Sequence, residues 1–459
     1  MTISTIFTVI AVLALIGFSA ARQRSVALVG GDTAKLHSLP RHYGYFGTAC
    51  VLLPSITVFV LWLVFGQTVV ESLMLSGLPD KVVAAYDGEI HILLNRIRIA
   101  VEQGSRIEND PDILNAAEHY FRLYKTGLWA TFGLSLATGL MGMAFAVNKA
   151  HPSFRARNRF ESILMVCLMV SSGIAIVTTL GIVASLLFES LRFFAEVPVG
   201  EFLFGLHWSP QTALRADQVG SSGAFGAVPL FAGTLLISFL ALLVAGPIGL
   251  LSAIYLTQYA NTTVRSIVKP VLEILAGVPT VVYGFFAAIT VAPWLRRTGE
   301  GFGIPIAAES ALAAGLVMGI MIIPFVSSLS DDAITAVPKE LEEGSLALGA
   351  TRSETITKVI LPAALPGIVG AFLLAISRAV GETMIVVMAA GMRPNLTANP
   401  FEAVTTVTVQ IVALLTGDQA FDSAKTLSAF ALGLILFIIT LGLNVAALRL
   451  VRKYREIYE

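Results

Sequence analysis

The chain has 459 residues, of which 56% are hydrophobic and 13% are charged, and its mean hydropathy is +0.81. Soluble domains average about 25% charged residues, so this composition indicates an integral membrane protein and excludes a soluble one. Lys plus Arg and Asp plus Glu number 30 each, which leaves no net charge to suggest nucleic-acid binding. The sequence contains no G-x-x-x-x-G-K-[ST] loop, so the chain is not expected to hydrolyse nucleotide itself.

Nine apolar stretches approach the length of about 20 residues that a membrane-spanning helix needs. They lie at residues 3–21, 44–66, 127–147, 162–188, 226–256, 270–295, 310–329, 363–391 and 426–450. The first stretch has no basic segment before it, and Arg22 and Arg24 follow it, which favours an uncleaved span over a signal peptide. We therefore predict an all-α membrane protein with nine spans.

Basic residues gather in alternate loops and in the C-terminal tail, which predicts the orientation of the spans. The basic residues that agree are Arg22, Arg24, Lys35, Arg41, Lys149, Arg155, Arg157, Arg159, Arg265, Lys269, Arg449, Arg452, Lys453 and Arg455. They predict an N-terminus outside the cell and a cytoplasmic C-terminus, with Arg296 and Arg297 as two exceptions. Cys50 and Cys167 lie inside apolar stretches, so neither a disulfide nor a metal site is expected.

Residues 67–126 form an external segment with a pattern of its own. Apolar residues recur there at helical spacing, namely Ile90, Leu93, Leu94, Ile97 and Val101. Asp110 and Pro111 suit the cap and first turn of a second helix. We predict a helical hairpin that packs on itself, with a sensor or partner-docking role as the alternative.

The next external segment, residues 193–210, is rich in aromatic residues. Trp and Phe in such a place usually anchor a protein at the membrane interface, and that is the expectation here. The glycine-rich loop at residues 220–226 is expected to be flexible.

A polar hairpin at residues 331–362 follows the seventh stretch. Pro338 suits a first helical turn, where its missing N–H costs nothing. The first short helix should stop at Gly349, and Thr351 with Glu354 has the spacing of a capping box that begins a second helix. Pro362 should end that second helix. Two short helices bent around Gly349 would suit docking into a groove of a partner.

The eighth stretch, residues 363–391, carries Arg378 and Glu382. A charge near the bilayer centre costs about 2.5–3.5 kcal/mol on insertion scales, so it needs a partner or a function. The i,i+4 spacing would place both side chains on one helix face, where they could pair. Three interpretations stay open: a structural ion pair, a charged part of a substrate path, and a role in subunit assembly.

The hairpin resembles the EAA loop of ABC importer permeases. The matching residues are Glu343-Gly344-Ser345, then Gly349, then the sequence VILP at residues 359–362. Gly344 and Ser345 replace the two alanines of the family pattern, which is a small-for-small exchange. The resemblance implies that the hairpin is the coupling helix seated in a cleft of the ATP-binding subunit, with Glu343 as a contact and Gly349 as the turn.

A narrower resemblance covers roughly residues 160–459. The stretches FLFGLHWSP, GAVPLFAGTLLIS, LAGVPTVVYGFF and RAVGETMIV are similar to the PstC-type permease of the high-affinity phosphate importer, whereas the sister PstA type usually carries G-E-T-A-P at the last of these. The resemblance implies a type I ABC importer permease core of the MetI-like kind, with about six spans at residues 156–459. Residues 1–155, with about three spans, are an N-terminal extension outside that resemblance.

The resemblance also implies a function and partners. In the family, the Arg and Glu of the RxxGE stretch are linked to phosphate passage, which assigns Arg378 and Glu382, with the adjoining Thr383, to the substrate path. The implied partners in the bacterial inner membrane are a PstA-type permease, a dimer of PstB-type ATP-binding subunits that hold ATP and Mg, and a periplasmic PstS-type phosphate-binding protein. No cofactor is expected in this chain.

Three other functions compete with this interpretation. The chain could import molybdate, sulfate or phosphonate, it could be a free-standing channel or secondary transporter, or it could be a membrane-embedded sensor with residues 67–126 as its input. The hairpin argues against a channel, which has no need of a docking element. Inverted sequence repeats, which would favour a secondary transporter, are not evident.

Overall fold

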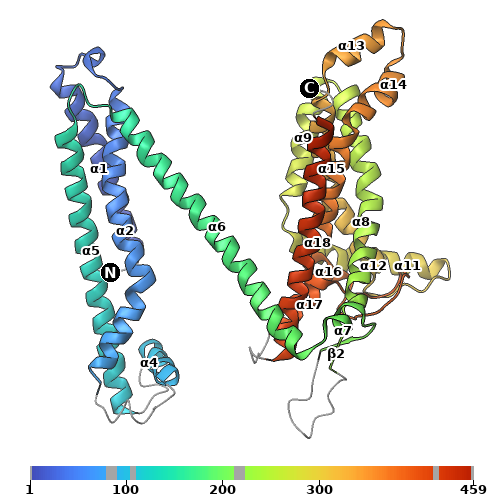
Figure 1. The fold of residues 1–459 in the computed structure, drawn as a ribbon, viewed down its shortest axis with the longest axis horizontal. Coiled ribbons are helices and arrows are strands. Elements are labelled where there is room, and N and C mark those ends of the chain that lie inside the picture. The colour runs from blue at the N-terminus through green and yellow to red at the C-terminus, as the bar shows by residue number, and fades with distance from the viewer. Residues whose placement is uncertain (1–2, 79–89, 104–109, 211–222, 417–422, 456–459) are drawn as a thin grey trace. The chain divides into compact units, whose positions relative to one another are not determined.

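A computed structural model of the chain describes residues 3–78, 90–103, 110–210, 223–416 and 423–455. The chain divides into two compact units, Met1–Val177 and Thr178–Glu459, which are described separately below (Figure 1). Helices dominate both units, and the predicted all-α fold is confirmed. The division falls inside α6, Ala156–Glu196, whereas the sequence predicted a boundary where this helix begins.

Unit 1 is built on three long helices that lie side by side (Figure 1). They are α1 (Ile3–Leu28), α2 (Pro40–Ser76) and α5 (Pro111–Lys149), with the short 3₁₀ helix η1 (Thr33–Lys35) after α1. Glycine lets α2 and α5 approach closely, since a Cβ at Gly142 would lie 1.8 Å from the backbone oxygen of Cys50. Small residues at a helix contact are the usual means of packing in membranes.

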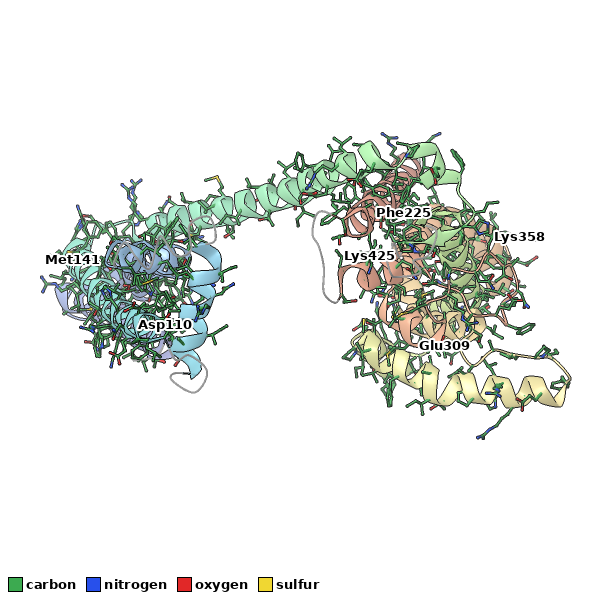
Figure 2. All side chains as sticks on the ribbon, turned by 90° about the horizontal axis from the view of Figure 1, so that it is seen from below. Asp110, Met141, Phe225, Glu309, Lys358 and Lys425 are labelled. Carbon is green, nitrogen blue, oxygen red and sulfur yellow. The ribbon has the colours of Figure 1, made fainter. Side chains whose placement is uncertain are left out.

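The predicted hairpin of unit 1 is confirmed within the described residues. Helix α4, Ile90–Gln103, packs on the ends of α2 and α5, and Leu93 and Ile97 are fully buried in a cluster with Met74 and Ile113. Asp110, labelled in Figure 2, caps α5 by accepting a hydrogen bond of 3.0 Å from the Asp112 N–H. The apolar face of α4 thus covers the ends of two spans.

Unit 2 consists of many shorter helices and a two-stranded ribbon. Its elements are α7 (Val199–Phe204), β1 (Trp208–Ser209), β2 (Ala224–Phe225), α8 (Val228–Ile254), η3 (Tyr255–Tyr259), α9 (Thr262–Ala276), α10 (Thr280–Phe286), η4 (Ala287–Val291), α11 (Ala292–Gly301), α12 (Ala311–Thr335), α13 (Lys339–Ala347), α14 (Arg352–Thr355), η5 (Ile356–Ile360), α15 (Leu361–Val380), α16 (Met384–Ala389), α17 (Val407–Leu415) and α18 (Ala424–Arg455). The ribbon is antiparallel and pairs Trp208 with Phe225. In unit 2, η3, η4 and η5 are π-turns.

Helix α12 is the centre of unit 2. Its Val317, Met318 and Ile322 are buried against α8 and belong to the largest apolar cluster. A Cβ at Gly319 would lie 2.9 Å from the backbone oxygen of Ala241, so glycine is needed where α12 and α8 meet.

Eight described helices are long and apolar enough to cross a membrane, and the number reaches the predicted nine if one bent helix pair counts as a single span. The stretch 270–295 is broken between α9 and α10, and the two parts meet at 86°. Pro279 at the break cannot donate a backbone hydrogen bond, and Gly277 caps the end of α9. Arg265 of α9 lies beside the end of α12 and Leu295 of α11 packs beside its beginning, so the broken pair runs along the length of α12.

The aromatic residues at 193–210 are largely packed inside unit 2, although Phe204 is 77% exposed. Phe193, Phe202 and Trp208 are buried with Phe225 in one cluster, and the rings of Phe193 and Phe202 meet edge to face at 5.2 Å. The ribbon and α7 cover these three side chains, so they pack within the chain, and the interfacial anchoring of the segment stays a prediction. Residues 220–222 of the glycine-rich loop lie outside the described residues.

Candidate functional site: a coupling hairpin and a charged helix break

The predicted hairpin forms between α12 and α15 and projects beyond the neighbouring helices (Figure 1). Helix α13 ends before Gly349, which has φ +89°, a left-handed conformation that suits glycine. The Ala350 N–H donates to the Ser345 carbonyl oxygen at 3.2 Å, and the Ser345 and Thr355 hydroxyls lie 2.9 Å apart. The turn is thus closed by the backbone and the two arms are joined by side chains.

The capping box is also present. The Glu354 N–H donates to the Thr351 hydroxyl at 3.3 Å, and the Thr351 N–H donates to the Glu354 carboxylate at 3.0 Å. Lys358, at the edge of unit 2 in Figure 2, pairs with Glu354 at 3.3 Å. These local bonds fix where the second arm begins, as the sequence predicted.

Pro362, however, does not end the second arm. The helix continues from Arg352 through the π-turn Ile356–Ile360 into α15, and Pro362 lies in the first turn of that segment. A π-turn is a common adjustment inside a helix, and here it precedes a residue without an N–H. The second arm and the following span are therefore one helical element.

The tip of the hairpin exposes apolar side chains. Leu348 is 91% exposed and Leu346 is 43% exposed, and Glu343 and Gly344 are exposed beside them. A leucine so exposed on a polar element has no packing function within this chain. The tip, defined by Glu343, Leu346 and Leu348, is suited to a cleft of another subunit.

Arg378 and Glu382 do not lie on one helix face, and the pairing that their spacing allowed is not formed. Helix α15 ends at Val380 with Gly381 as its cap, and Glu382 lies beyond it. The Glu382 carboxylate instead accepts hydrogen bonds from the Met384 N–H at 3.0 Å and the Ile385 N–H at 3.4 Å. It caps α16, which favours a negative charge at that helix end. The stretch 363–391 is therefore a span followed by a break and a short helix.

Arg378 lies in the last turn of α15, where the helix dipole favours a cation. Its side chain is exposed, and its guanidinium lies over the Phe325 ring of α12 at 5.9 Å from the centroid. Among the described residues it makes no ion pair with an acidic group. Its planar donors remain available to an oxyanion.

The break between α15 and α16 is stabilised by buried polar side chains that the sequence had not indicated as functional. The Thr408 hydroxyl donates to the Glu382 carbonyl oxygen at 2.8 Å, and the Gln410 amide donates to the Met392 carbonyl oxygen at 3.1 Å. Gln410 also accepts from the Trp208 indole N–H at 3.0 Å. The run TTVTVQ at residues 405–410 was the available signal, since polar residues in an apolar stretch usually have bonding partners.

Thr383, the third predicted path residue, is half-buried as the N-cap of α16.

A second feature missed from the sequence is a cluster of charges between α9 and α12. Asp331 is 2% exposed and receives two bonds from Arg265, at 3.0 and 3.1 Å, and one from Lys269 at 2.7 Å. In the sequence, Arg265 and Lys269 indicate only the orientation of the spans. A buried carboxylate needs such partners because an unpaired buried charge is strongly unfavourable.

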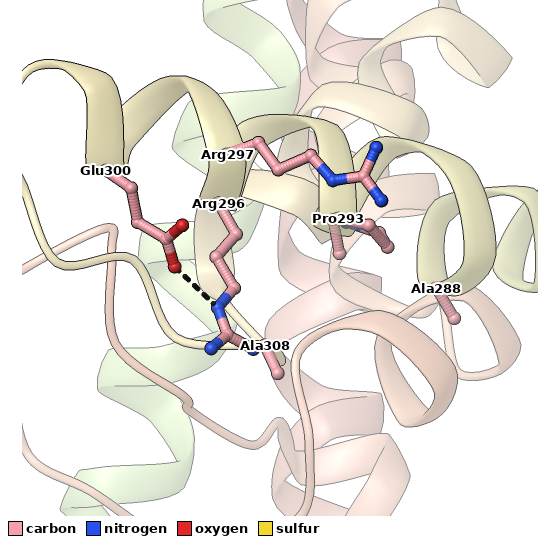
Figure 3. A pocket seen from close by; sticks show the side chains of 7 residues that line it. Ala288, Pro293, Arg296, Arg297, Glu300 and Ala308 are labelled. Atoms are coloured by element: carbon pink, nitrogen blue, oxygen red, sulfur yellow. Dashed lines mark hydrogen bonds and ion pairs between the residues drawn. The ribbon is translucent and has the colours of Figure 1, made fainter.

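A cavity of about 340 Å³ lies beside α11, and Arg296, Arg297 and Glu300 line part of it (Figure 3). Arg296 is bound to Glu300 at 3.1 Å, while Arg297 points away from that pair. None of the predicted path residues lines this cavity.

Two family models match the chain. The one described as "Phosphate ATP-binding cassette transporter" matches residues 7–178, and "Binding-protein-dependent transport system inner membrane component" matches residues 245–456. The first match coincides with unit 1, so the N-terminal extension also has relatives.

Individual relatives agree with the second match. A probable ABC transporter permease protein YqgH from Bacillus subtilis is 34% identical over 274 residues, which is 60% of this chain and 83% of that protein. The phosphate transport system permease protein PstC from Pasteurella multocida is 32% identical over 62% of this chain and 87% of its own length. A crystal structure of a bacterial ABC transporter involved in alginate import aligns with 65% of this chain at 14% identity, with a TM-score of 0.44 and 99% of its own chain covered.

The helices of unit 2 and the exposed hairpin, together with the second family match, define the class of inner-membrane permeases of binding-protein-dependent transporters. Within this class, the chain belongs to the PstC-type family of ABC importer permeases.

Proposed function

We propose that this chain is the PstC-type permease subunit of an ATP-driven phosphate importer. The observation that carries the proposal is the EAA-type hairpin, whose closed turn at Gly349 presents an exposed tip to a partner. The PstA-type permease would complete the path, a dimer of PstB-type subunits would bind the tip, and a PstS-type protein would deliver phosphate.

The substrate assignment rests on Arg378 and on the relatives. Arg378 is an exposed guanidinium at the end of a span, with no acidic partner among the described residues. Arginine suits tetrahedral oxyanions because its donors form a planar fork. The PstC relative is named as a phosphate transport permease.

The proposed place is the bacterial inner membrane, with the N-terminus outside. The hairpin and the end of α18 lie at the same end of unit 2 (Figure 1), so a cytoplasmic hairpin requires a cytoplasmic C-terminus. With the bent pair counted as one span, nine crossings and an external N-terminus meet this requirement, because an odd number of crossings places the two termini on opposite sides.

In this scheme the chain supplies no catalytic group. ATP and Mg would bind on the partner subunits, and closure of their dimer would move the hairpin. Arg378, Glu382 and Thr383 would face the anion on its way between this permease and the second one. The described residues hold no cluster of three or more metal-ligating groups, and the proposal requires none here.

The test is uptake of radiolabelled phosphate in a strain that lacks this chain, with and without the restored gene. Arsenate, sulfate and molybdate serve as competitors. We expect restored phosphate uptake that arsenate inhibits and sulfate and molybdate do not. Restored uptake that molybdate or sulfate inhibits best would replace phosphate by that oxyanion, and unchanged uptake would contradict a transport function.

A further inference from the structure

The root of the hairpin is joined to α12 by apolar packing. Ile356 and Ile360 of the second arm are buried together with Ile334, which lies in the last turn of α12. A hairpin that moves when a partner subunit closes must therefore carry the end of α12 with it, because packed interiors deform little.

One turn before Ile334, Asp331 binds α12 to α9. Arg265 donates hydrogen bonds to both carboxylate oxygens of Asp331, and Lys269 donates to one of them at 2.7 Å. The side chain of Asp331 is 3% exposed, whereas those of Arg265 and Lys269 are 35% and 31% exposed. A cavity beside this cluster measures only about 10 Å³, so a ligand does not separate the two helices there.

Helix α9 is the first part of the bent pair, and it connects this cluster to α10, the second part. The Tyr283 hydroxyl of α10 donates to the Leu275 carbonyl oxygen of α9 at 2.8 Å, across the break at Gly277–Pro279. This bond ties the two parts together, so the break is a fixed bend between α9 and α10.

Helix α10 in turn touches the segment that Glu382 caps. A Cβ at Gly284 would lie 2.9 Å from the Met384 carbonyl oxygen and 3.3 Å from the Ile385 Cα. Met384 and Ile385 are the residues whose N–H groups bind the Glu382 carboxylate. A displacement of α10 therefore reaches the candidate path without passing through α15.

We propose that Asp331 is a positioning residue for transport, whose bonds to Arg265 and Lys269 pass the movement of the coupling hairpin through the broken span to the Glu382 segment. The proposal rests on the proposed function, because it assumes that the hairpin is driven by an ATP-binding subunit. The ion cluster would transmit movement from α12 to α9, a function distinct from docking by the hairpin and from contact with the anion by the path residues.

Asp331→Asn is the informative variant. It keeps the size of the side chain and removes the charge that holds the two cations. Arg265 and Lys269 keep contact with water, so their release does not leave a fully buried charge, and we expect the complex to assemble. Asp332→Asn is the matched control, because the Asp332 side chain is 67% exposed and lies 3.7 Å from Lys269 alone.

The experiment uses the complete transporter, purified with its permease and ATP-binding partners and reconstituted in proteoliposomes with the binding protein. ATP hydrolysis and phosphate uptake are measured on the same preparation. We expect Asp331→Asn to hydrolyse ATP while uptake per ATP falls about tenfold, within the usual range of coupling between sites. Asp332→Asn and Lys269→Arg should stay within about twofold of the wild type, since both retain the Asp331 pairs.

Uptake per ATP equal to that of the wild type in Asp331→Asn would overturn the proposal. Failure of that variant to assemble, together with normal uptake per ATP in the milder Lys269→Gln, would also overturn it and leave a purely structural ion cluster. Failure of the proposed function itself would be seen in the wild-type complex, which would not take up phosphate in any preparation.

Discussion

The hydroxyl of Thr408 donates a hydrogen bond of 2.8 Å to the backbone carbonyl oxygen of Glu382, while the carboxylate of Glu382 binds the first N–H groups of α16. Glu382 is thus fixed by hydrogen bonds at both its backbone and its side chain. This fixes the position of the helix break and gives Glu382 two separable properties, a capping oxygen and a negative charge.

Two substitutions separate these properties of Glu382. Glu382→Gln keeps an oxygen that accepts from the Met384 N–H but loses the charge, whereas Glu382→Ala loses both. We expect Glu382→Ala to lower stability by about 1 kcal/mol, as lost helix caps do, and Glu382→Gln to leave stability close to that of the wild type. Both should reduce phosphate uptake if the charge acts in the path. Thermal unfolding of the purified complex and uptake measure the two effects, and full uptake in Glu382→Gln would show that the charge is not used.

Arg378→Gln should abolish most phosphate uptake without disturbing assembly. The guanidinium makes no ion pair within the described residues, so its loss leaves no acidic partner unpaired there. Arg378→Lys should retain part of the activity, because an ammonium provides charge but not a planar fork. Arg393→Gln, a change in an exposed loop, is the control. Loss of the partner subunits from purified Arg378→Gln would favour the assembly interpretation instead.

Gly349→Val should weaken binding of the ATP-binding subunit. No atom lies within 4 Å of a Cβ at Gly349, so the cost comes from the left-handed backbone, about 1–2 kcal/mol for an L-residue. The turn should open to relieve this strain and displace the tip. Gly344→Ala is the matched control, because Gly344 lies inside α13, where alanine is favoured. Copurification of the ATP-binding subunit is the measurement, and equal recovery with both variants would contradict the docking function.

Leu348→Asp tests the tip without changing the turn. Leu348 is 91% exposed, so a charge there should leave the folding of the chain intact. Buried in a partner's cleft, the same charge would be unfavourable, and we expect the ATP-binding subunit to dissociate during purification. Leu396→Asp, at a residue 47% exposed in another loop, should retain it. Retention by both variants would mean that the tip is not in the interface.

The helical hairpin of unit 1 offers a test that is independent of transport. Ile97 of α4 is fully buried against α2 and α5, whereas Ile99 on the same helix is 46% exposed. We expect Ile97→Ala to destabilise the docking of α4 by about 2–5 kcal/mol and Ile99→Ala to have little effect. Limited proteolysis of the protein in membranes should then cleave α4 faster in the first variant only.

Local chemistry made several features predictable. Gly349, Thr351 and Glu354 act on backbone groups within a few residues, so the turn and the capping box followed from spacing alone. The spans and the helical periodicity of α4 are equally local, because length and pattern determine them. The EAA-like pattern then led to the family that the comparisons show.

Other features depend on partners far away in the sequence. Spacing suggested that Arg378 and Glu382 pair, yet the helix ends between them because Thr408 and the N-terminus of α16 hold Glu382 elsewhere. The burial of Phe193 and Trp208 likewise depends on the strand at Phe225.

The sequence by itself determined the membrane class, eight of the apolar spans and the form of the polar hairpin, since hydropathy, spacing and turn residues act locally. Only the tertiary structure decided that the apolar stretch 270–295 is sharply bent, that Arg378 and Glu382 are not paired, and that Asp331 joins α9 to α12. The reason is that a buried charge or a freed backbone group must find a partner, and the partner's place is set by how distant helices pack.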